Sequence, residues 1–218
     1  MTDSSKYEGD ELVSRIEFSQ KMFSLIEGQL NNFLEYVPLS LEHLDVYSLK
    51  LVTILLEIGP EIISCFDLAT YPYTKSLREV FGDGDIARAR EKLLQKEKKI
   101  RTRRQSLTFK DYYDFLSNFG YCNLKTATTL LKELNAYMCP FEELNAEWWE
   151  SYNLLKHDKY SNLKKATLRN ALKSLGALFW LVDYNSKKIF QEFHSDIFEK
   201  IDFEKMRTLK IDRSHTRI

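Results

Sequence analysis

Apolar side chains recur at intervals of three and four residues between positions 168 and 182. The repeating members are Leu168, Leu172, Leu175, Phe179 and Val182. This spacing places them in one stripe along an α-helix, because successive helical residues are about 100° apart around the axis. The pattern predicts an amphipathic helix whose apolar side faces a core.

The first third of the chain predicts two longer helices. The first covers residues 12–36, and the second begins with Asp45 as its N-cap and continues to about residue 69. Pro60 lies inside the second helix and is expected to bend or divide it. Apolar residues occupy more than one side of this second helix, so we expect it to be central in the fold.

Shorter helices are expected in the rest of the chain. Their ranges are 108–119, with Thr108 as the cap and Asp111 in the first turn, 123–138, 147–157 and 189–201. No stretch alternates convincingly enough to predict a strand. We therefore expect a single domain over residues 1–218, built as an all-α, up-and-down helical bundle with its core in residues 12–72 and 107–202.

Residues 74–106 differ from this core and are expected to form a charged helical insertion. Residues 86–104 contain nine lysines or arginines against two glutamates, and few apolar positions. A solvated charged face explains this composition without a partner. The alternative is an RNA contact, for which the candidate residues are Lys96, Lys98, Lys99, Arg101, Arg103 and Arg104.

The overall composition is that of a globular protein able to bury a sizeable core. Hydrophobic residues make up 44% and charged residues 29%, and 32 acidic residues balance 32 basic ones. With a net charge of zero, any nucleic acid must be bound by a local patch. Three scattered cysteines indicate no disulfide framework or metal site, so no metal or cofactor is expected. The chain shows no signal peptide or membrane-spanning run, which predicts a cytoplasmic protein.

The predicted helix 147–157 carries an unusual mixture of side chains on one broad face. Trp149, Tyr152, Asn153, Lys156 and His157 recur at three- and four-residue spacings. One interpretation is structural, with the aromatic rings in the core and His157 at an interface. The other is a polar site in which His157 transfers protons or orients a ligand.

A polar seam on the predicted helix 45–69 could support that site. Lys50, Glu57, Glu61 and Ser64 follow one another at spacings of seven, four and three. The seam is either a solvated edge or a line of contact with the helix 147–157. In the second case Glu57 or Glu61 would meet Lys156 or His157 and raise the imidazole pKa.

These residues also resemble a known family. The run W-W-x-x-Y-N-x-x-K-H-D, followed by A-T-L-x-N-A-L-x-x-L-x-x-L-F, is similar to the C-terminal helical hairpin of HEPN-like (higher eukaryotes and prokaryotes nucleotide-binding) domains. Ribonucleases of that superfamily carry an arginine, often followed by a polar residue, and a histidine four to six residues after the arginine. Asn153 and His157 match the polar and histidine positions. Tyr152 stands at the arginine position, and Lys156 is the candidate for the missing cation.

The resemblance implies an RNA-binding or RNA-cleaving protein with a role in stress or phage defence. As an enzyme it would be a metal-independent endoribonuclease with His157, Asn153, Lys156 and Tyr152 at the catalytic site. HEPN-like domains commonly form homodimers through the motif helices, here with Trp148, Trp149, Gly176 and Ala177 at the two-fold contact. The alternative is a non-catalytic module that dimerises or binds a partner protein.

Overall fold

The structure is a computed structural model that describes residues 4–70, 108–118, 126–127, 137–138, 140–141, 146–187 and 189–198. The charged insertion expected at 74–106 lies outside these residues, as do the six basic side chains proposed there to contact RNA. The described part is mostly helical, as predicted. Its elements are α1 (Ser4–Leu34), η1 (Leu41–His43), α2 (Leu49–Thr70), α5 (Phe109–Asn118), β1 (Thr126–Ala127), β2 (Tyr137–Met138), α6 (Glu147–His157), η4 (Leu163–Lys165) and α7 (Leu168–Lys187).

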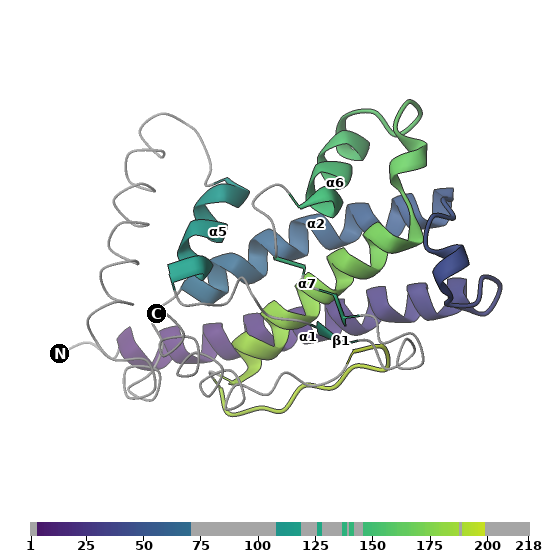
Figure 1. The fold of residues 1–218 in the computed structure, drawn as a ribbon. Helices are drawn as coiled ribbons and strands as arrows, with labels where there is room; N and C mark the ends of the chain where they lie inside the picture. Colours follow the sequence, from purple (N-terminus) through teal and green to yellow (C-terminus); the bar gives the residue numbers. More distant parts are fainter. Residues whose placement is uncertain are drawn as a thin grey trace, which may run out of the picture.

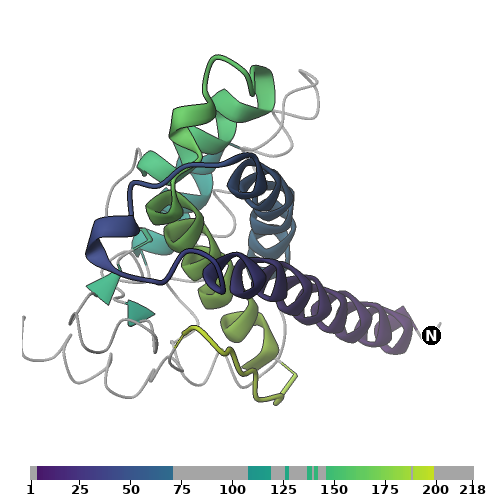
Figure 2. The ribbon, with the colours of Figure 1, turned by 90° about the vertical axis from the view of Figure 1, so that its right-hand side faces the viewer.

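The two central helices, α2 and α7, lie side by side and run in the same direction (Figure 1). Near their beginnings the backbone N–H of Leu168 donates to the carbonyl of Val46 at 2.9 Å. Near their ends Asn185 Nδ2 donates to the carbonyl of Cys65 at 3.0 Å. Helix α1 packs against both and extends to one side of the pair, as the turned view shows (Figure 2). Helix α6 also packs against both, so α2 and α7 are covered from two sides.

Burial of α7 explains the stripe found in the sequence. Leu168, Leu172, Leu175, Phe179 and Val182 are all fully buried. The opposite side is buried too, with Asn170, Ser174 and Asp183 at most 1% exposed. The prediction of a helix is confirmed, but α7 is surrounded by protein rather than amphipathic at the surface.

The start of α2 differs from the prediction. The helix begins at Leu49, and Ser48 Oγ accepts the backbone N–H of Leu51 at 3.2 Å, so Ser48 takes the capping role expected of Asp45. Asp45 instead forms an ion pair with Arg169 at 3.1 Å. Pro60 does not divide α2. It lies on the exposed side, where water can bond the carbonyl group that proline leaves without a donor.

The continuous helix expected at 123–138 is wrong. Thr126 pairs with Met138 and Ala127 with Tyr137 in a short antiparallel ladder. Threonine and tyrosine favour strands, and this local preference prevails over the helical spacing of the apolar residues.

The helix expected at 189–201 is also wrong over its described part. Residues 189–198, here called the C-terminal strap, follow α7 without helical structure, and Phe190 adopts a positive φ of 57°. The Glu27 carboxylate accepts the Ser195 hydroxyl and the backbone N–H groups of Asp196 and Ile197. Burial raises the pKa of Glu27. In the strap, hydrogen bonds from the backbone to side chains thus take the place of the backbone hydrogen bonds of a helix. The spacing of apolar residues does not reveal which of the two kinds of bond forms.

The strap covers Gly176 of α7. A methyl group on Gly176 would lie 3.3 Å from the Phe198 ring, Ala177 is fully buried, and Trp148 is 1% exposed. Gly176, Ala177 and Trp148 therefore pack within the chain and do not offer the two-fold contact expected of them. Trp149 is half-buried and lines an open surface, and the homodimer itself stays a prediction. In the described part, no helix has the length and apolar character needed to cross a membrane.

Candidate functional site

An open groove of about 560 Å³ separates the beginning of α5 from the outer side of α6. Its described lining comprises Thr108, Phe109, Lys110, Ala146, Trp149, Glu150, Asn153, Leu154 and His157. Two of the residues predicted to form the site, Asn153 and His157, are therefore brought together in one concave surface.

The opposite side of α6 explains this orientation. Trp148, Ser151, Tyr152 and Leu155 are buried. Trp148 Nε1 donates to the carbonyl of Pro140 at 2.8 Å, and Asn170 Nδ2 of α7 donates to Ser151 Oγ at 3.0 Å. With these residues fixed inward, helical periodicity turns Asn153 and His157 outward.

The α5 wall is fixed by aromatic packing and by a helix cap. The Phe109 ring stacks on Trp149 with ring centroids 4.9 Å apart, and it meets Trp148 edge-on at 5.6 Å. Asp111 Oδ2 accepts both the backbone N–H of Thr108, at 2.8 Å, and its hydroxyl, at 2.9 Å. The carboxylate of the first turn thus bonds back to the capping residue, as in a capping box. Helix α5 begins at the predicted place.

Tyr152 does not line the groove. Its side chain is 7% exposed and packs on α2 at Gly59, where a methyl group would lie only 2.1 Å from Tyr152 Cε2. The Tyr152 and Trp149 ring centroids are 5.0 Å apart. Lys156 is exposed, with its Nζ 5.9 Å from the Tyr152 ring centroid, and it does not line the groove either. The structure therefore separates Tyr152 and Lys156 from Asn153 and His157.

Two residues of the polar seam of α2, Lys50 and Glu57, bond to Gln29 of α1. Glu57 Oε2 accepts Gln29 Nε2 at 2.6 Å, and Gln29 Oε1 accepts Lys50 Nζ at 2.9 Å. Glu61 is half-buried, and this burial raises its pKa. Within the described ranges, neither Glu57 nor Glu61 bonds to Lys156 or His157. The expected contact is absent, and for Glu57 the reason is its bond to Gln29 of α1.

Sequence reasoning missed two charged residues of the groove, Lys110 and Glu150. Lys110 is exposed and lies on the α5 wall, across the groove from α6. Its position in the first turn of α5 could be predicted, but its proximity to α6 depends on the Phe109–Trp149 stack. Glu150 could have been found, since it lies three residues before Asn153 and therefore on the same side of the helix.

The groove combines groups that can bind and act on a polar ligand. It offers an ammonium group from Lys110, a carboxylate from Glu150, an amide from Asn153 and an imidazole from His157. The Asn153 amide can donate and accept hydrogen bonds, and so can the two ring nitrogens of the His157 imidazole. Among the residues described, no three His, Cys, Asp or Glu side chains form a group that could hold a metal ion.

Comparison of the chain with models of known families, with curated proteins and with solved structures gives no match.

Proposed function

We propose that this protein is a HEPN-like RNA-binding domain that cleaves RNA in the α5–α6 groove. The supporting observation is that Asn153 and His157, four residues apart on α6, both line the groove. The other side of the same helix is packed into the core. An exposed imidazole beside an amide serves no packing purpose there. It is suited to proton transfer at a bound ligand.

The proposed reaction is attack of a ribose 2′-hydroxyl on the adjacent phosphodiester. His157 takes the proton of the 2′-hydroxyl while the 2′-oxygen forms a bond to phosphorus. The bond from phosphorus to the 5′-oxygen breaks, and water protonates the departing oxygen. The products are a 2′,3′-cyclic phosphate and a 5′-hydroxyl end. Asn153 donates a hydrogen bond to a phosphate oxygen and holds it beside the imidazole.

Lys110 takes the electrostatic role that the HEPN-like resemblance assigns to arginine. Tyr152, at the arginine position, is buried against Gly59 and carries no charge. Lys110 supplies a cation from the facing wall of the groove. An ammonium group stabilises developing negative charge on phosphate, although without the two-pronged geometry of a guanidinium.

A second candidate is a HEPN-like module that binds RNA or a protein without cleaving it. Burial of Tyr152 favours this alternative, because the position of a catalytic arginine is used for packing between α6 and α2. A role in stress or phage defence follows from the family resemblance in either case.

The test is cleavage of a fluorescently labelled single-stranded RNA by the purified protein in the presence of EDTA. We expect shortened products that end in a 2′,3′-cyclic phosphate, and no cut where a 2′-deoxy nucleotide replaces the attacked ribose. Binding without cleavage would support the non-catalytic module. Equal cleavage of the 2′-deoxy substrate would contradict the mechanism.

A further inference from the structure

The loop between α6 and α7, residues 158–166, presents an aromatic ring and several cations to solvent. Tyr160 is 94% exposed, more than any other large apolar or aromatic side chain that the structure describes. Lys159, Lys164 and Lys165 are exposed as well. Over the described ranges, none of these three lysines takes part in an ion pair.

The loop is held in shape by its own polar side chains. Asp158 Oδ1 accepts the backbone N–H groups of Tyr160 and Ser161, both at 3.1 Å. Asn162 Nδ2 donates to the carbonyls of Leu154 and Asp158, at 3.3 and 2.8 Å, and so bonds to the end of α6. Asp158, the only acid in the loop, is thus turned to the backbone. Tyr160 is exposed on an ordered turn.

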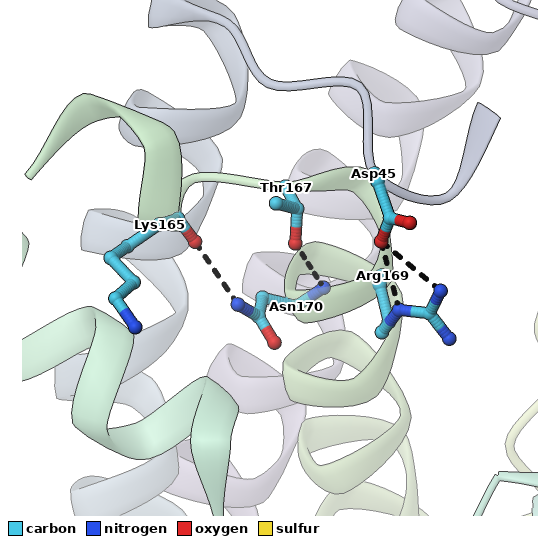
Figure 3. A network of polar contacts seen from close by, with 5 residues as sticks. All are labelled: Asp45, Lys165, Thr167, Arg169 and Asn170. Atoms are coloured by element: carbon cyan, nitrogen blue, oxygen red, sulfur yellow. Dashed lines mark hydrogen bonds and ion pairs between the residues drawn. The ribbon is translucent and has the colours of Figure 1, made fainter.

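The far end of the loop is anchored to the body of the protein (Figure 3). Asn170 Nδ2 donates to the Lys165 carbonyl at 3.0 Å, and the backbone N–H of Asn170 donates to Thr167 Oγ1 at 3.2 Å. Arg169 donates hydrogen bonds to the carboxylate of Asp45, which lies in the segment before α2. Figure 3 shows the Lys165 ammonium group extending away from this network. The backbone is fixed while the cation remains accessible.

We propose that the α6–α7 loop is a binding site for single-stranded RNA, with a base stacked on Tyr160 and phosphates bound by Lys159, Lys164 and Lys165. The inference rests on the proposed function for the identity of the polymer. An aromatic ring and nearby cations are the two elements by which proteins bind single strands. Little ordering cost opposes binding, because the loop is already fixed.

The exposed ring distinguishes a single strand from a duplex. In a duplex each base is stacked between neighbours, so its face is closed to Tyr160. The lysines alone would bind either form, or an acidic peptide, through charge. A contribution from Tyr160 that is confined to single strands is therefore the specific consequence of this site.

The loop begins directly after a residue of the groove. His157 lines the groove, ends α6 and immediately precedes Asp158. Tyr160 follows His157 by three positions, so their Cα atoms lie within about 11 Å of each other. The loop would hold the nucleotides that flank the cleaved bond.

The experiment measures binding by fluorescence anisotropy, with a labelled single-stranded 12-nucleotide RNA and the same RNA in a duplex. Tyr160→Ala should weaken single-strand binding about tenfold, and Tyr160→Phe should retain it, because stacking needs the ring and not the hydroxyl. Duplex binding should not change. Lys164→Gln should weaken binding of both forms and reduce its salt dependence, since one fewer counterion is released.

Matched controls are available on exposed surface elsewhere in the chain. Tyr36 is 85% exposed and Lys21 is exposed on α1. Tyr36→Ala and Lys21→Gln should bind RNA as the parent does. If either control weakens binding as much as its loop counterpart, the loop is not the site.

The outcomes separate this inference from the proposed function. A parent that binds RNA through Tyr160 but does not cleave it would support the loop site and refute the nuclease. A parent that cleaves RNA while Tyr160→Ala and Lys164→Gln bind normally would overturn the loop site alone. If poly-glutamate displaces the RNA and Tyr160→Ala has no effect on binding, the surface binds any polyanion through charge alone. That result would also overturn the loop site.

Discussion

Replacement of His157 by alanine is expected to lower the rate of RNA cleavage by about 10²–10⁴-fold, the usual contribution of general acid–base catalysis. The imidazole is exposed in the groove and supports no core packing. The melting temperature should therefore stay that of the parent. Single-turnover cleavage with saturating protein measures the chemical step separately from binding.

His194 provides the matched control. Its side chain is 76% exposed, and its Nε2 lies 3.8 Å from Glu192 on the strap, outside the groove. His194→Ala should cleave at the parent rate. Equal losses in the two variants would show that the effect of His157→Ala is not specific to the groove. Unchanged cleavage by His157→Ala would rule out His157 as the base.

Replacement of Tyr152 by arginine is expected to destabilise the fold by about 3–5 kcal/mol, the range found when a large aromatic side chain is lost from a core. The Tyr152 ring fills the space left by Gly59, and the incoming charge would enter an interface between α6 and α2. An unpaired buried charge adds to the loss. The guanidinium would not reach the groove, so cleavage should not increase. Urea denaturation and the cleavage assay together measure both effects.

Tyr152→Phe separates packing from chemistry at this position. It keeps the ring that contacts Gly59 and removes only the hydroxyl, so both stability and cleavage should stay close to those of the parent. A stable Tyr152→Arg variant with faster cleavage would contradict the structure and place residue 152 in the catalytic site.

Regular helices could be predicted from sequence wherever one physical signal dominated. The apolar stripe of residues 168–182 located α7, and the bounds of α6 agree with the predicted helix at 147–157. The C-terminal strap could not be predicted in the same way. Its apolar residues suit a helix equally well, and the buried carboxylate of Glu27, about 170 positions earlier, bonds the backbone of the strap.

The candidate site was predictable within one helix and unpredictable between helices. Asn153 and His157 share one side of α6, which their spacing determines. Tyr152 was expected on the same broad face, but only the packing of α6 on α2 at Gly59 shows that it turns inward. Lys110 lies at the site because its neighbour Phe109 stacks on Trp149. These two aromatic residues belong to distant segments, so their contact cannot be predicted from a local sequence pattern.

Binding of RNA in the α5–α6 groove can be measured by an NMR titration of the histidine side chains. The ligand is a single-stranded RNA that carries 2′-deoxy nucleotides to prevent cleavage. Single histidine substitutions would assign the four imidazole signals, of which those of His43, His157 and His194 belong to the described part of the chain. RNA bound in the groove should shift the His157 signals and leave those of His43 and His194 in place. RNA binding that leaves the His157 signals unchanged would contradict binding in the groove.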